Sequence, residues 1–127
     1  MNIVNLDIIC AKYGGQISRN VNEAFDDKDK TENLITKSLG VLQEDGIYAF
    51  FLYLLSRGSS EKDGANALSQ DSLLLLKEII PTSASDELSV AKDLANNLNH
   101  LLLAKEMLER TLIYARYHAK ALPKGEG

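Results

Sequence analysis

Hydrophobic residues recur along most of the chain at the three- and four-residue intervals of an amphipathic helix. Only two prolines, Pro81 and Pro123, interrupt the chain, and good helix formers dominate the long stretches before and between them. The pattern therefore predicts an all-α fold. We expect residues 1–127 to form a single helical bundle, compact to elongated in shape, with a long C-terminal helix.

The first predicted helix covers residues 3–24. Gly14 and Gly15 lie in its middle, where each glycine lowers helix stability by about 1 kcal/mol relative to alanine. We therefore expect a kink or a break at this point. A polar run follows, in which Asp29 and Glu32 have the spacing of a capping box, and this spacing predicts the start of the second helix.

The second predicted helix continues through the most apolar part of the chain. It is amphipathic as far as Leu42 and becomes apolar on all sides after Gly46, over residues 47–55. A buried strand is the alternative for this short run, but Ile47 is its only β-branched residue, which favours a helix. The next residues lack periodicity and are rich in turn formers, so we expect a flexible loop over residues 57–70.

Two further helices are predicted. Residues 71–80 form a short helix that ends before Pro81, because proline disfavours the helical conformation of the residue preceding it. The last helix covers residues 86–122, with a bend at the weak helix formers of its asparagine-rich stretch, residues 96–99. Positions spaced alternately three and four residues apart form a heptad seam in this helix, and nine of the ten are apolar: Ala91, Leu94, Leu98, Leu101, Lys105, Leu108, Leu112, Ala115, Ala119 and Leu122.

Composition limits the class of protein. The chain has 127 residues, of which 45% are hydrophobic and 25% charged, and a formal net charge of −4, values typical of one globular domain. The single cysteine, Cys10, excludes an internal disulfide and makes a reducing cytoplasm the expected location. The N-terminus has no features of a secretory signal. The longest apolar run, residues 47–55, is well short of the roughly 20 residues that a membrane-spanning helix needs.

No motif indicates catalysis, a metal site or a cofactor. His100 and His118 would lie about 27 Å apart on a straight helix, too far to share a metal ion. Residues 13–15 lack the Lys-Ser/Thr pair of a phosphate-binding loop. Cys10, in an apolar segment, fits a small buried hydrophobe better than a nucleophile. We expect a protein that is not an enzyme and binds no cofactor.

Charge is unevenly distributed along the chain. Through Ala104 there are nine Lys and Arg against fifteen Asp and Glu, a net charge of −6, whereas from Lys105 onward there are five against three, a net charge of +2. Basic and tyrosine side chains of the last helix share an arc of about 120° opposite the seam: Arg110, Tyr114, Tyr117, Lys120 and Lys124. Cations interleaved with rings suit a nucleic-acid backbone and its bases. The alternative is that the cations complement the helix dipole and the tyrosines pack on a neighbour.

Two segments carry a family resemblance. Residues 38–58 read SLGVLQEDGIYAFFLYLLSRG, in which a leucine, a glycine seven residues later and an apolar block ending in Ser-Arg follow one another. Residues 103–122 read LAKEMLERTLIYARYHAKAL, a closing helix that ends in basic residues and Ala-Lys-Ala. Together they resemble the small helical subunit of CRISPR–Cas effector complexes, most closely the Cmr-type (type III-B) small subunit, with the type I-A small subunit as the near alternative.

The resemblance implies a non-catalytic protein of antiviral defence that stacks in several copies along a ribonucleoprotein, beside the guide–target duplex. The implied partners are other effector subunits, guide RNA, target nucleic acid and copies of the chain itself, in the cytoplasm and away from membranes. The expected contacts to the nucleic-acid backbone are the cations in or next to the matching segments: Arg57, Arg110, Arg116, Lys120 and Lys124. Tyr117, as a stacking ring, completes the expected site.

Two other functions stay open on the sequence alone. One is a helical protein–protein adaptor or homodimer, in which the heptad seam pairs between chains and the basic face is only solvated. The other is a small enzyme that acts through Cys10 or a histidine.

Overall fold

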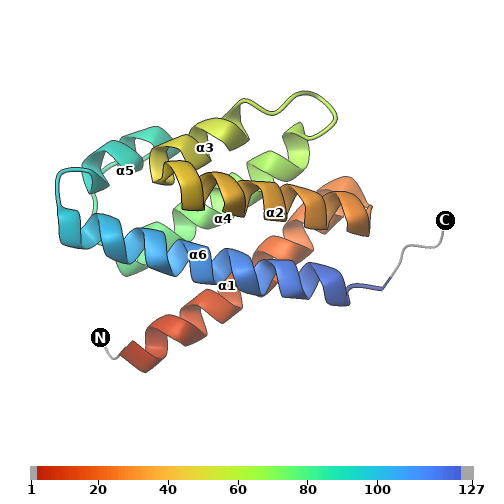
Figure 1. The fold of residues 1–127 in the computed structure, drawn as a ribbon, viewed down its shortest axis with the longest axis horizontal. Coiled ribbons are helices and arrows are strands. Elements are labelled where there is room, and N and C mark those ends of the chain that lie inside the picture. Colours follow the sequence, from red (N-terminus) through yellow and green to blue (C-terminus); the bar gives the residue numbers. More distant parts are fainter. Residues whose placement is uncertain (1–2, 124–127) are drawn as a thin grey trace.

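The computed structural model describes residues 3–123 and contains helices but no strands within that range (Figure 1). The helices are, in chain order, α1 (Ile3–Phe25), α2 (Lys28–Asp45), α3 (Ile47–Leu55), α4 (Lys62–Ile79), α5 (Glu87–Leu94) and α6 (Leu98–Ala121). The prediction of an all-α fold with a long C-terminal helix is confirmed.

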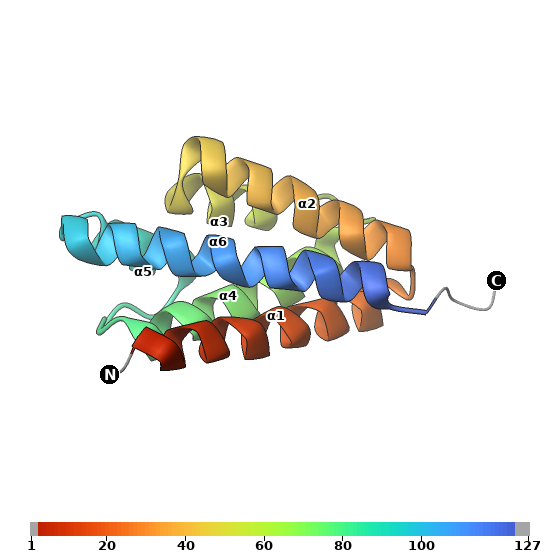
Figure 2. The same cartoon turned by 60° about the horizontal axis from the view of Figure 1, so that its bottom comes forward.

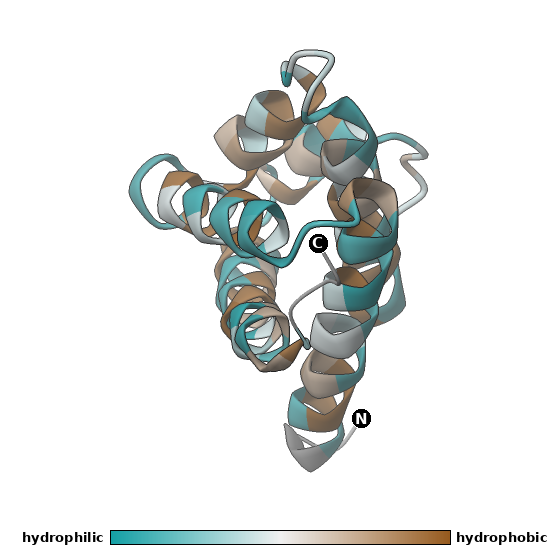
Figure 3. Cartoon of the chain, turned by 90° about the vertical axis from the view of Figure 1, so that its right-hand side faces the viewer, coloured by the Kyte–Doolittle hydropathy of each residue, from teal (hydrophilic) through white to brown (hydrophobic). Residues whose placement is uncertain are grey.

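The four long helices pack around one centre (Figures 1 and 2). α1 and α6 run in the same direction and cross, whereas α2 runs antiparallel to α6, and α4 runs antiparallel to α1. The short helix α3 packs on α2, α4 and α5. All six helices contribute side chains to the hydrophobic core, while the first turns of α1 extend beyond the other helices (Figure 3). Within the described range, no helix has the length and apolar character to span a membrane.

α1 is a single helix that runs through Gly14 and Gly15, so the predicted break is wrong. The reason is packing against α6. A Cβ atom on Gly14 would lie 2.6 Å from Tyr114 Cβ and 3.0 Å from both the Ala115 nitrogen and the Thr111 oxygen. Gly14 therefore lets the backbones of α1 and α6 approach closely, and the resulting contacts outweigh its low helix propensity.

The second predicted helix is two helices, α2 and α3, which meet at Gly46. Gly46 has a φ of 93°, a conformation that residues with a Cβ rarely adopt, and its N–H still bonds to the Leu42 oxygen at 3.0 Å. The side chain of Asp27, not Asp29, caps α2 by accepting a 3.1 Å hydrogen bond from the Lys30 N–H. The choice of helix over strand for residues 47–55 is confirmed.

The loop between α3 and α4 is shorter than the predicted residues 57–70, because α4 begins at Lys62. Gly64, one of the turn formers within the predicted loop, lies in the first turn of α4 with the Phe25 ring against it. Space for that ring, and not a turn, is what requires a glycine here. α4 ends at Ile79, and the extended Ile80 before Pro81 confirms the predicted stop.

The last predicted helix is divided into α5 and α6 at the asparagine-rich stretch, where a bend was predicted. Asn97 caps α6 by accepting a 3.1 Å hydrogen bond from the His100 N–H. Most of the seam lies inside the chain's own core. Its positions from Leu108 to Ala119 are fully buried, whereas Leu98 is exposed. The seam is therefore an intramolecular packing surface, and pairing between chains through it would require these residues to leave the core.

Polar side chains join α1 to α4. Asp71, which is buried, accepts hydrogen bonds from Gln16 Nε2 at 2.9 Å and from Asn20 Nδ2 at 2.8 Å. Tyr13 donates its hydroxyl proton to Glu78 Oε1 at 3.2 Å. These bonds satisfy buried polar groups and fix the register of the two helices.

Gly14→Ala should lower the free energy of unfolding by about 1–3 kcal/mol, because the added methyl group must push α6 away from α1. Gly40→Ala is the matched control. Gly40 lies inside α2 with nothing within 4 Å of a built Cβ, so the same change should raise stability by up to about 1 kcal/mol. Urea unfolding followed by circular dichroism measures both. Similar effects of the two substitutions would contradict the close contact at Gly14.

Candidate nucleic-acid interface

Three of the residues predicted to contact nucleic acid lie on the outer side of the last turns of α6. Tyr117 is 65% exposed, Lys120 is exposed and Arg116 is half-buried. Lys120 Nζ lies 3.6 Å from Glu32 Oε1 on α2. Arg116 forms no ion pair with an acid in residues 5–123. Lys124, the remaining predicted cation of this region, lies outside the described residues.

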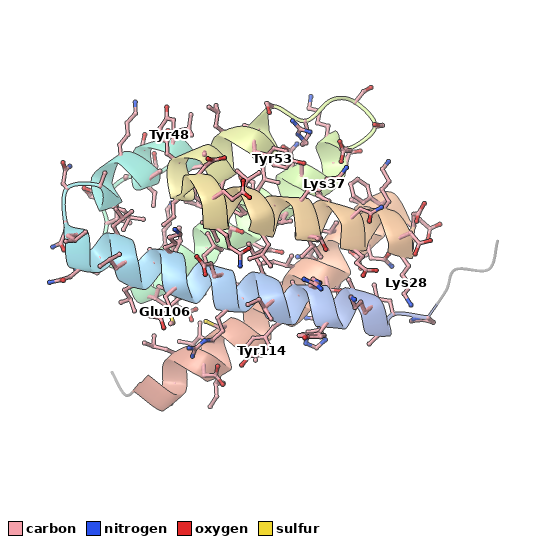
Figure 4. The ribbon with its side chains drawn as sticks, viewed as in Figure 1. Lys28, Lys37, Tyr48, Tyr53, Glu106 and Tyr114 are labelled. Carbon is pink, nitrogen blue, oxygen red and sulfur yellow. The ribbon has the colours of Figure 1, made fainter. Side chains whose placement is uncertain are left out.

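Arg110 and Tyr114, in contrast, are held by an acid on α1. Arg110 Nη1 lies 3.4 Å from Asp7 Oδ1, and its Nη2 lies 3.7 Å from Glu106 Oε1. The Tyr114 hydroxyl donates a 2.7 Å hydrogen bond to the same Asp7 oxygen. Figure 4 shows Tyr114 and Glu106 on the side of α6 where α1 passes. The predicted arc is therefore not one free face, because Asp7 on the crossing helix α1 already contacts Arg110 and Tyr114.

Arg57 lies in the loop between α3 and α4, across α2 from α6 (Figure 1). Its guanidinium carbon is 3.9 Å from the centre of the Tyr53 ring, and its Nε donates a 3.0 Å hydrogen bond to the backbone carbonyl oxygen of Tyr53. Its Nη1 lies 3.8 Å from Glu61 Oε1. These contacts hold the guanidinium against the Tyr53 ring, and the side chain as a whole stays 28% exposed.

Three lysines of α2 complete the set of cations, and the sequence interpretation missed them. Lys30 lies over the Phe25 ring, 4.5 Å from its centre, and its Nζ donates to the Ser60 oxygen in the loop that carries Arg57. Lys37 is exposed. Lys28 extends from the start of α2 toward the end of α6 (Figure 4). The run that holds Lys28 and Lys30, residues 26–30, contains three acids and two lysines, so it was interpreted only as a helix start.

These residues define a surface over the N-terminal half of α2, called here the α2 surface. One flank consists of Lys30, Lys37 and Arg57, and the other of Lys28, Arg116 and Lys120. At 100° per residue, Lys30 and Lys37 are about 20° apart on α2, and Glu32, which contacts Lys120, is about 160° from Lys30. The outward arc between the flanks carries three small uncharged residues, Asn33, Thr36 and Gly40, and one exposed acid, Asp29, about 100° from Lys30. Cations therefore border, on both sides, a strip of small residues that also holds the carboxylate of Asp29.

Two of the cations already have acidic partners, Glu32 for Lys120 and Glu61 for Arg57. Exposed ion pairs of this kind contribute only about 0–1 kcal/mol each. A phosphate can therefore replace either carboxylate at small cost, but the acids reduce the attraction for a free polyanion. The α2 surface is suited to weak phosphate contacts that depend strongly on salt.

Other chemistry has less support in the described structure. Burial raises the pKa of the Cys10 thiol, and its Sγ contacts the Met107 oxygen at 3.4 Å, both of which favour an inert thiol. Residues 3–123 contain no group of three His, Cys, Asp or Glu side chains that could hold a metal ion. Comparison of the chain with protein-family models, with curated proteins and with solved structures found no match.

The pKa of Tyr114 is raised above its ordinary value, chiefly because its hydroxyl bonds to Asp7; partial loss of solvent and the negative charge of Asp7 add to this effect. The hydrogen bond stabilises the fold below pH about 10 and is lost as the pH rises through the raised pKa. The difference between ultraviolet titrations of the wild type and Tyr114→Phe should therefore have its midpoint above the ordinary tyrosine value. Asp7→Asn should lower that midpoint. A midpoint that Asp7→Asn leaves unchanged would rule out the contact.

Proposed function

We propose that this chain is a non-catalytic small subunit of a CRISPR–Cas ribonucleoprotein effector complex, of the Cmr (type III-B) type or the type I-A type. In this role it stacks along the guide–target duplex and contacts the nucleic-acid backbone, in the cytoplasm, as part of antiviral defence. Its partners are larger effector subunits, guide RNA, target nucleic acid and further copies of itself.

The observation that carries this proposal is the α2 surface. Its cations come from both segments that resemble the family and from the part of α2 that precedes the first segment: Arg57 lies in the first segment, and Arg116 and Lys120 lie in the second. α2 and α6 pack side by side, so segments far apart in sequence contribute to one surface. A filament subunit needs such a surface for the duplex and other faces for its neighbours.

The proposed contacts are with phosphates and carry no sequence information. Guide pairing supplies specificity in such complexes, and a subunit that follows the backbone has no need to read bases. Tyr117, exposed beside Arg116 and Lys120, offers a ring for an unpaired base. Each subunit contributes little to the binding affinity, because acids pair with some of its cations. Several copies fixed along one duplex act together, and their combined attachment is much stronger than that of one copy.

The adaptor function has one observation in its favour, an exposed apolar face on α3, which is described below. The heptad seam no longer supports it, since the buried seam positions belong to the core. A protein contact through α3 is also compatible with the role of an effector subunit, which must bind other proteins.

A tagged pull-down from the native cells tests the proposal directly. We expect larger CRISPR effector subunits and short guide RNA to be recovered with the chain, and the RNA to be reduced by a high-salt wash. The identity of the larger subunits then separates the Cmr type from type I-A. Recovery of the protein alone, or of one unrelated partner without RNA, would refute the assignment.

Substitutions on each flank test the α2 surface within the purified complex. Arg116→Ala with Lys120→Ala, and separately Lys30→Ala with Lys37→Ala, should each lower retention on the RNA-bearing complex on the order of tenfold and reduce the salt slope by about two. Lys12→Ala with Lys92→Ala removes the same charge from exposed positions on α1 and α5 and should leave retention unchanged. If all three double variants behave alike, net charge and not the α2 surface governs binding.

A further inference from the structure

α3 is apolar on all sides, although only part of it is buried. Its inner face enters the core through Ile47, Phe50, Phe51 and Leu54. The outer face consists of Tyr48, Leu52 and Leu55, at positions i, i+4 and i+7, which are 43%, 48% and 46% exposed. A helix without any polar face normally packs on both sides. Three large side chains in one exposed stripe therefore indicate a surface that another molecule covers.

The charges at the two ends of the α3 stripe decide what fits it. The helix itself contains no cation, which disfavours nucleic acid. Two exposed acids, Glu44 and Asp45, precede its N-terminal end, and Arg57 follows its C-terminal end. The backbone dipole of the helix is positive at the first end and negative at the second. The α3 stripe is therefore apolar in the middle and opposite in charge at its ends, which makes it complementary to an antiparallel copy of itself.

We propose that the α3 stripe is a homodimer interface, in which two copies pair through a two-fold axis with their α3 helices antiparallel. In a two-fold contact, every pair occurs twice: when one residue of the first copy meets a second residue of the other copy, the reverse pair forms as well. With the axis beside Leu52, Tyr48 of one copy lies opposite Leu55 of the other. The same register brings Asp45 near Arg57 of the second copy. Arg57 can exchange the Glu61 carboxylate for this partner, because that ion pair, at 3.8 Å, is long and partly exposed.

This contact goes beyond the proposed function and does not depend on it. A two-fold contact joins two copies and then closes, so it differs from the repeated contact that builds a filament along a duplex. It also requires no nucleic acid. The purified chain without RNA is therefore the right sample, and failure of the dimer leaves the pull-down result unaffected.

Sedimentation velocity over a range of concentrations measures the dimer. The wild type should show a concentration-dependent dimer, and Leu52→Glu should raise its dissociation constant by at least about 30-fold, because two carboxylates would meet at the axis. Leu74→Glu is the matched control, since Leu74 on α4 is equally exposed, at 50%. Circular dichroism confirms that both variants are folded. A wild type that stays monomeric up to about 1 mM, or equal effects of the two variants, would overturn the proposal.

Cross-linking and charge reversal test the geometry. Leu52→Cys should form a disulfide-linked dimer on mild oxidation, whereas Leu74→Cys should not; Cys10 is fully buried and adds no background. Asp45→Arg should weaken the dimer by placing two cations together, and adding Arg57→Asp in the same chain should restore it. A dimer that cross-links equally through both cysteines, or a double variant weaker than Asp45→Arg alone, would exclude antiparallel pairing through α3.

Discussion

The close approach of α1 to α6 at Gly14 is the contact on which most of the structure depends. Without a side chain at this position, the α1 backbone lies against Thr111, Tyr114 and Ala115. The same crossing brings Asp7 to Arg110 and Tyr114. It buries the inner face of α6 from Leu108 onward, and the opposite side of that helix remains available to solvent. The missing side chain at Gly14 thus sets how closely α1 packs on the inner face of α6.

The surface that results has two regions with different chemistry. The α2 surface is bordered by cations from α2, α6 and the loop after α3, some of them paired with acids. Its interactions are electrostatic, individually weak and reduced by salt. The α3 stripe lacks charge between its ends, and its binding would come from burial of apolar area. Arg57 stands at the border of both regions, stacked on Tyr53 and paired with Glu61.

Three glycines explain why the helix boundaries were harder to predict than the helices themselves. A break was predicted at Gly14, which instead forms a close helix contact. A loop was predicted to include Gly64, which instead makes room for the Phe25 ring. Gly46 lies between two helices that were predicted as one. Glycine tolerates all three roles, and only the neighbouring segment selects among them. The stop before Pro81 and the break at Asn97 were predictable because proline and a capping asparagine act within their own segment.

Local pattern by itself determined the all-α class, the position of the core faces and the exposure of Tyr117 and Lys120, since helical periodicity and propensity are properties of neighbouring residues. Only the tertiary structure decided which cations share a surface. It assigned Arg110 to Asp7, more than a hundred positions away in sequence, and joined Lys30 to the loop that carries Arg57. Ion pairs and side-chain contacts depend on distances in space. Between segments that are remote in sequence, those distances are set only when the helices pack.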